Sequence, residues 1–113
     1  MNTAEVLERA ADIMQARGKA CEAYIDGDGS VCVVGACALA SGIPADSDEI
    51  AQWWRSKFGD ADPTSWVRRA FGNVTGWSDG NDAPTVIAGL RAVAAVERAK
   101  SRMLPVVTEQ VPA

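Results

Sequence analysis

Residues 2–18, NTAEVLERAADIMQARG, carry the clearest periodicity in this chain and decide its fold. Asn2 followed by Glu5 matches a capping box, in which two side chains satisfy exposed amides at a helix start. Apolar residues then recur at helical spacing, at Val6, Leu7, Ala10, Ile13 and Met14. Gly18 suits the position just after a helix end. The pattern predicts an amphipathic helix over 3–17.

The segment after this helix has the composition of a short β-hairpin. Two β-rich runs, residues 21–25 and 30–34, flank the sequence Asp-Gly-Asp-Gly at 26–29. Asp and Gly favour turns because they tolerate the backbone angles that turns require. Two such runs around a turn predict a pair of strands, which must pack on helices to be stable.

Helix start and stop signals divide the rest of the chain. Residues 35–40 are small and apolar and precede Ser41-Gly42, which predicts one or two turns of buried helix. Another helix is predicted to open at 47–49 and to end at Phe58. Asp62-Pro63 is an N-cap followed by a first-turn proline, which predicts a further helix ending at Phe71.

Residues 74–83 are predicted to form a polar loop carrying Trp77. The last helix is predicted to start at Asp82 and Pro84 and to run to about Ser101. Residues 105–113 include two prolines and lack periodicity, so we expect a disordered tail. The predicted fold class is α+β, mostly α, with four to five helices packed with one short β-hairpin. We expect a single globular domain over 1–104.

Composition narrows the classes of function. The chain has 113 residues, 15 acidic against 11 basic side chains and a net charge of −4, whereas nucleic-acid binders usually carry a basic surplus. No run approaches the roughly 20 apolar residues of a membrane helix. The first helix carries acids within its apolar pattern, unlike a signal peptide, so we expect a cytoplasmic protein without contact to a membrane.

The chain contains no histidine, which removes the Ser-His-Asp and Cys-His catalytic arrangements and histidine-bearing zinc sites. Three cysteines, Cys21, Cys32 and Cys37, are an odd number and lack the close spacing of a zinc knuckle, so we expect reduced, partly buried thiols. We therefore expect no catalytic residues, no metal and no cofactor. A strand-to-helix junction at 33–36 remains a candidate anion site, because amides are exposed at helix starts.

Four tryptophans and several arginines are candidates for protein contacts, because Trp, Tyr and Arg are the usual anchors of interfaces. Burial in the core competes with that role for each of them. The interaction candidates form two groups: Trp54, Arg55 and Phe58 in one, and Arg68, Arg69, Trp77 and Asp79 in the other.

Several short motifs occur one after another along the chain. They are Arg17-Gly18, the segment Val31-Cys32-Val33-Val34-Gly35-Ala36, the segment Val74-Thr75-Gly76-Trp77-Ser78-Asp79, and the helix start Thr85-Val86-Ile87. This order resembles a small family of unknown function found in actinobacteria and their phages, over about residues 6–98. The family pattern has a Cys-x-x-Gly-Ala segment and a Trp-Asn-Asp loop.

The chain departs from this family pattern at Ser78, where Asn is common, and at Lys19-Ala20, where an aromatic residue often follows the glycine. The resemblance carries over no established catalytic role. It implies a fold-defining set of residues, comprising Cys32, Gly35, Ala36, Trp77 and Asp79, in which Asp79 either caps backbone amides or belongs to a site.

Three hypotheses follow. The first is a noncatalytic interaction protein, encoded by a phage and acting on a host or phage protein. The second is a small-molecule or anion-binding module, with a potential enzymatic role, at the Gly35 helix start and the loop from Trp77 to Asp79. The third is a nucleic-acid-associated protein that uses Arg68, Arg69, Arg91 and Arg98. The net negative charge of the chain makes this the least favoured hypothesis. Alanines recurring along the last helix are also compatible with a homodimer.

Overall fold

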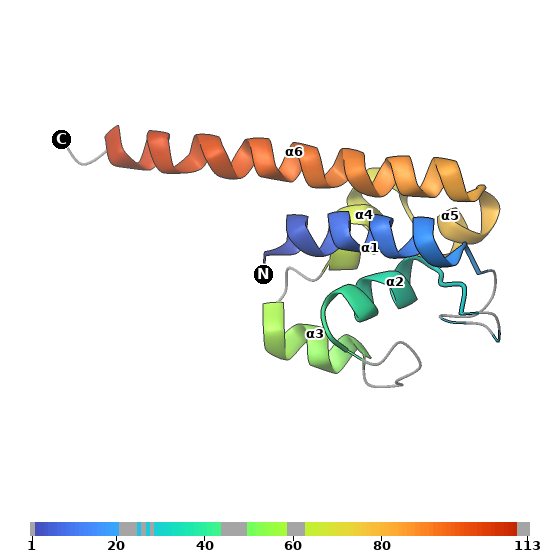
Figure 1. The fold of residues 1–113 in the computed structure, drawn as a ribbon. Helices are drawn as coiled ribbons and strands as arrows, with labels where there is room; N and C mark the ends of the chain where they lie inside the picture. The colour runs from blue at the N-terminus through green and yellow to red at the C-terminus, as the bar shows by residue number, and fades with distance from the viewer. Residues whose placement is uncertain are drawn as a thin grey trace.

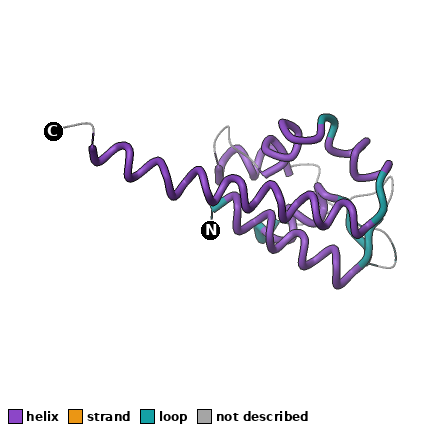
Figure 2. Tube along the Cα trace, turned by 90° about the horizontal axis from the view of Figure 1, so that it is seen from above, coloured by secondary structure: helices purple, strands orange, loops and turns teal. Residues whose placement is uncertain are grey.

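The computed structural model describes residues 2–20, 25, 27, 29–43, 50–58 and 63–110. The helices are α1 (Thr3–Arg17), α2 (Val33–Ala40), α3 (Ile50–Phe58), α4 (Pro63–Phe71), α5 (Val74–Gly80) and α6 (Ala83–Gln110). Within those residues there is no strand, and the shorter helices gather around α1 and the first half of α6 (Figures 1 and 2). No helix in the described part of the chain is long and apolar enough to span a membrane.

Helix α1 has the bounds that the sequence predicts. The Asn2 side chain accepts a hydrogen bond from the Glu5 amide at 2.8 Å, which satisfies one of the exposed donors of the first turn. Gly18 ends the helix with a φ of +91°, in the region that disfavours other residues, while its amide donates to the Met14 carbonyl at 2.8 Å. The predicted helix and both of its ends are therefore confirmed.

Helix α1 lies between α2 and α6, and this sandwich forms the core (Figure 1). Its fully buried side chains are Val6, Leu7, Ala10, Ala11 and Met14, and those of α6 include Val86, Leu90 and Ala94. Many of these side chains are alanines, as are Ala36, Ala38 and Ala40 of α2, so the helices approach closely.

Two ion pairs fix α6 against the outer face of α1. The Arg98 guanidinium donates two hydrogen bonds to the Glu8 carboxylate, at 2.7 and 2.8 Å, in the bidentate geometry that suits arginine. Arg91 donates to Asp12 at 3.0 Å and to Gln15 at 2.7 Å. Both arginines are partly exposed, so their ion pairs add little to the stability of the fold. Their main effect is on the alignment of α6 along α1.

The predicted β-hairpin is wrong, and the fold is all-α in the described residues. Val31 makes isolated β-bridges to Lys19 and Ile25, and these bridges do not extend into strands among the described residues. Residues 33 and 34, predicted to continue the second strand, are already helical. Residues 21–24, 26 and 28 lie outside the described part of the chain.

Local capping and burial explain why the β-rich run forms a helix. The Cys32 sulfur accepts a hydrogen bond from the Gly35 amide at 3.4 Å, so the thiol takes the N-cap role usually played by an oxygen. Val33 is fully buried, and packing of its branched side chain outweighs its modest helix penalty. The predicted helix over 35–40 therefore begins two residues earlier.

The predicted loop over residues 74–83 is also wrong, because residues 74–80 form α5. The Asn73 side chain accepts hydrogen bonds from the Gly76 amide at 2.8 Å and from the Thr75 hydroxyl at 3.0 Å. Two glycines within α5 weaken its helical pattern, which hides it in the sequence. The Asn73 cap was the available signal for it.

Helices α3 and α4 end where the sequence predicts, at Phe58 and Phe71. The predicted opening of α3 at 47–49 lies outside the described residues, and so does Asp62, the predicted cap of α4. At the start of α6, Asp82 accepts from the Thr85 amide at 3.0 Å, which agrees with the predicted start. Helix α6 continues to Gln110, beyond the predicted end near Ser101, and the disordered tail over 105–113 stays a prediction.

We expect Leu7→Ala to lower the free energy of unfolding by about 2–5 kcal/mol, because it leaves a cavity where α1 meets the core. Urea unfolding followed by circular dichroism measures this change. Arg9→Ala, on the exposed face of the same helix, is the matched control and should stay within about 0.5 kcal/mol of wild type. Equal losses in the two variants would contradict the assignment of α1 as the central helix.

Candidate interaction groove

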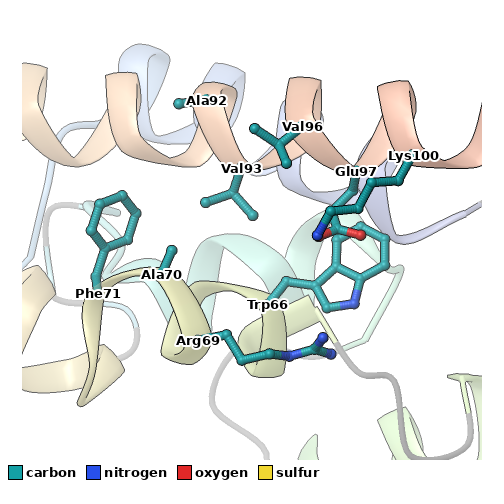
Figure 3. Close-up of a pocket in the computed structure, with 9 residues that line it drawn as sticks. All are labelled: Trp66, Arg69, Ala70, Phe71, Ala92, Val93, Val96, Glu97 and Lys100. Atoms are coloured by element: carbon teal, nitrogen blue, oxygen red, sulfur yellow. The ribbon is translucent and has the colours of Figure 1, made fainter.

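A groove of about 330 Å³ lies between α4 and the middle of α6 (Figure 3). It is lined by Trp66, Arg69, Ala70, Phe71, Ala92, Val93, Val96, Glu97 and Lys100. Helix α4 buries Thr64 and Val67 in the core. Trp66 and Phe71 lie on the side of α4 that borders α6, where they line the groove. The apolar channel therefore lies between side chains of α4 and of α6.

The groove exposes apolar side chains that a core would normally cover. The large hydrophobic residues with substantial exposure in the described chain are Trp53 at 43%, Phe71 at 39% and Val96 at 53%. Two of these three line the groove, while Val93 at its floor is 7% exposed. An exposed apolar channel with a buried floor is a typical feature of a protein-binding surface.

Charged side chains surround the apolar floor. Lys100 donates to Glu97 at 3.3 Å along one edge of the groove, formed by α6, and Arg69 lies on the opposite edge, formed by α4 (Figure 3). The Lys100 side chain is 62% exposed and that of Glu97 is 19% exposed, and ion pairs at a protein surface contribute little to stability. The arrangement of an apolar centre inside a polar rim matches the anatomy of protein interfaces.

Phe71, which lines the groove, is held in place by an aromatic stack. The rings of Phe71 and Trp77 are parallel, with centroids 4.2 Å apart. Gly89 of α6 allows this stack, because a Cβ there would lie 2.6 Å from Cζ2 of Trp77 and 3.2 Å from Cζ of Phe71. Trp77, predicted as an interaction candidate, is therefore half-buried between Phe71 and Gly89 and does not line the groove.

The candidate anion site at the start of α2 is occupied by the protein's own groups. The Val33 amide donates to Ser78 Oγ at 3.4 Å, the Gly35 amide to Cys32 Sγ, and the Ala36 amide to the Cys32 carbonyl at 2.8 Å. Ser78 is fully buried and Cys32 is 3% exposed. These amides are satisfied internally, so the helix start offers little to an anion.

Lys19 and Asp79 complete a polar cluster around this helix start. The Lys19 ammonium donates to the Ser78 carbonyl at 2.6 Å. Burial raises the pKa of the Cys32 thiol, the hydrogen bond from the Gly35 amide opposes this effect, and the Asp79 carboxylate raises the pKa further. A protonated, buried thiol is a poor nucleophile, so this arrangement favours a structural role for Cys32.

The remaining interaction candidates are dispersed. Trp54 is 4% exposed and donates its indole N–H to Ser41 Oγ at 3.3 Å, so the exposed tryptophan of α3 is its neighbour Trp53. Phe58 is half-buried against the core, and Arg55 is exposed. Arg68 is exposed on α4, apart from the residues that line the groove. Of the predicted candidates, the structure thus places Arg69 in the groove and stacks Trp77 on its lining residue Phe71. The other candidates lie elsewhere: Trp54, Arg55, Phe58, Arg68 and Asp79.

Sequence reasoning missed most of the groove. The groove residues that are absent from the predicted interaction candidates include Trp66, Phe71, Val93, Val96, Glu97 and Lys100. The available signal was Val96, which extends the apolar stripe of the last helix by a turn beyond Val93. Its exposure depends on how far α4 covers α6, which periodicity does not reveal.

Comparison with known proteins places the chain in a family. Residues 1–96 match the group described as a family of unknown function, DUF6197, and the chain belongs to this family. The family of unknown function implied by the resemblance is confirmed at that level. No curated protein and no solved structure matches the chain.

We expect Gly89→Ala to displace Trp77 from its stack on Phe71 and to lower the free energy of unfolding by about 1–3 kcal/mol, as overpacking does. Tryptophan fluorescence should change in the folded state, and urea unfolding gives the stability. Gly80→Ala is the matched control, because a Cβ there meets nothing within 4 Å. If both substitutions stabilise the protein, as alanine does in helices, the described contact between Gly89 and Trp77 is wrong.

The raised pKa of Cys32 predicts a loss of stability at alkaline pH. The folded state holds the thiol proton more tightly than the unfolded chain, whose cysteine pKa is about 8.5. The stabilisation is complete below that value and disappears as pH rises through the folded-state pKa.

Urea unfolding over a series of alkaline pH values measures this loss. Cys32→Ser keeps a capping atom but does not titrate, so its stability should decline less steeply with pH than that of wild type. Parallel declines in the two proteins would show that the Cys32 thiol does not carry the effect.

Proposed function

We propose that this chain is a noncatalytic interaction protein that binds an amphipathic helix of a partner protein in the α4–α6 groove. The observation that carries the proposal is the exposure of Phe71 and Val96 along a channel with a buried floor. Helices recognised in this way place apolar residues three and four positions apart into a groove formed by helices. The flanks of the groove, Arg69 on α4 and Glu97 with Lys100 on α6, offer both signs of charge to the polar sides of such a helix.

The internal capping of α2 weighs against an anion-binding module at Gly35. Such a module needs unsatisfied donors that converge on a cavity. Here Ser78 and Cys32 take the donors, and Trp77 turns toward Phe71 instead of toward Cys32. The described geometry therefore supports protein binding better than small-molecule binding.

The arrangement of the arginines also disfavours nucleic-acid binding. Arg91 and Arg98 are paired with acidic or polar groups of α1, and Arg68 and Arg69 are neighbours on α4. Phosphate binding needs several cations that point at one backbone. A phage or actinobacterial origin, a host or phage partner and a cytoplasmic location remain part of the proposal and rest on the sequence pattern.

The test of this function is binding of helical peptides. A display library of amphipathic helices, about four turns long, is selected against the full chain, and affinities are measured by fluorescence polarisation. We expect Val96→Asp to weaken the selected peptides by about 100-fold or more, because it places a charge at the apolar centre. Arg55→Ala on α3 is the control and should leave binding unchanged.

Selected peptides that bind the Val96→Asp variant as tightly as wild type would overturn the assignment of the groove. A failure to select any helix would count against the proposed function as a whole. Circular dichroism and urea unfolding of Val96→Asp check that the fold persists, which we expect because Val96 is 53% exposed.

A further inference from the structure

The α4–α6 groove is apolar at one end and polar at the other. Phe71 lies at the apolar end, and Trp66 lies at the opposite end, near the charged side chains that α6 contributes (Figure 3). Along α6 the lining runs from Ala92 to Lys100, a separation of eight residues that spans about 12 Å, or roughly two turns of a helix. A helix bound along this groove therefore meets different chemistry on its successive turns.

Two hydrogen-bond donors at the polar end of the groove are available to a partner. The guanidinium of Arg69 and the indole N–H of Trp66 make no hydrogen bond or ion pair within the described part of the chain. The two residues are three positions apart on α4, so their side chains are neighbours on its surface, and the Arg69 side chain extends toward the Trp66 ring (Figure 3). No buried side-chain nitrogen among the described residues lacks a partner, so this indole N–H is open to solvent.

The charges that line the groove do not balance. On α6 the Lys100 ammonium pairs with the Glu97 carboxylate at 3.3 Å, whereas the Arg69 guanidinium on the opposite edge has no carboxylate of the described residues as a partner. Two cations against one carboxylate leave one positive charge unmatched, on a chain whose net charge is −4. A guanidinium binds a carboxylate through two parallel hydrogen bonds, and an adjacent indole N–H can donate a third.

Building on the proposed function, we propose that the helix bound in the groove carries an aspartate or glutamate whose carboxylate is held by Arg69 and Trp66. The apolar side chains of the bound helix contact Phe71 and Val96, and the carboxylate lies one or two turns away along the same helix, about four or seven residues from them. A helix with a neutral or basic residue at this position would cover the Arg69 charge without supplying a counter-charge, which lowers affinity.

The composition of selected peptides is the first measurement. When the library of amphipathic helices is selected against the full chain, we expect Asp or Glu to be enriched at one position, about four or seven residues from the apolar side chains. The same library selected against Arg69→Glu should enrich Lys or Arg at that position instead, because the charge of the groove edge is reversed. A wild-type pool without acidic enrichment, or an acidic position that stays enriched in both pools, overturns the inference.

A matched pair of peptides measures the contact with Arg69. The form with Glu at the enriched position should bind wild type about tenfold more tightly than the form with Gln, and the two forms should bind Arg69→Gln equally, as measured by fluorescence polarisation. Arg68→Gln is the control, because Arg68 is exposed on the same helix but does not line the groove, and it should keep the preference. A preference that survives in Arg69→Gln overturns the inference.

Trp66→Phe separates the indole N–H from the aromatic ring. This variant keeps a ring in the groove and loses one donor, so the preference for Glu over Gln should fall to about threefold. Urea unfolding of the variant checks that the fold persists. An undiminished tenfold preference in the folded variant overturns the contact shared by Trp66 and Arg69.

The two proposals fail in different ways. Helices that bind wild type and lose binding to Val96→Asp, without distinguishing Glu from Gln, keep the proposed function and overturn the inferred acidic residue. Helices that prefer Glu but bind Val96→Asp as tightly as wild type lie outside the groove, and this result overturns both proposals. A chain against which no helix is selected also removes both.

Discussion

The packing of α1 between α2 and α6 is the constraint on which the rest of the structure depends. Helix α1 buries apolar residues toward both neighbours, and alanines at these contacts let the three backbones approach closely. The ion pairs of Arg91 and Arg98 then fix how far α6 slides along α1. Every other element is placed by what this sandwich leaves uncovered, because the remaining helices are too short to form a core alone.

The difference in length between α1 and α6 produces the surface that we assign to binding. Helix α1 has 15 residues and α6 has 28, so α1 covers one side of α6 for about half its length. Helix α4 covers a second side, but the two helices leave a channel where Val96 and Phe71 stay exposed. Removing such a channel from water is favourable, and contiguous exposed apolar surfaces mark interaction sites, which is why we assign this one to binding.

The polar groups near α2 explain the motif residues without invoking chemistry on a substrate. Cys32 caps the helix, Ser78 reaches the Val33 amide, and Lys19 holds the Ser78 carbonyl, which ties α5 to α2 and to the end of α1. The described groups satisfy one another, and no buried side-chain nitrogen or oxygen among them lacks a partner. In this structure the short motifs therefore join helices, and the exposed apolar residues are found elsewhere.

Local signals in the sequence determined the helices with clear caps: α1 from Asn2 to Gly18, the ends of α3 and α4, and the start of α6 at Asp82. These depend on hydrogen bonds and backbone angles within a few residues, so they can be inferred without the fold. The sequence left burial or exposure open for each tryptophan, Trp54 included. The tertiary structure decided that Trp54 is buried, that Val33 is helical although its side chain favours strands, and that residues 74–80 form a helix. It alone assembled the groove, because Trp66, Phe71 and Val96 meet through the packing of α4 on α6, and such distant contacts leave no periodic trace in the chain.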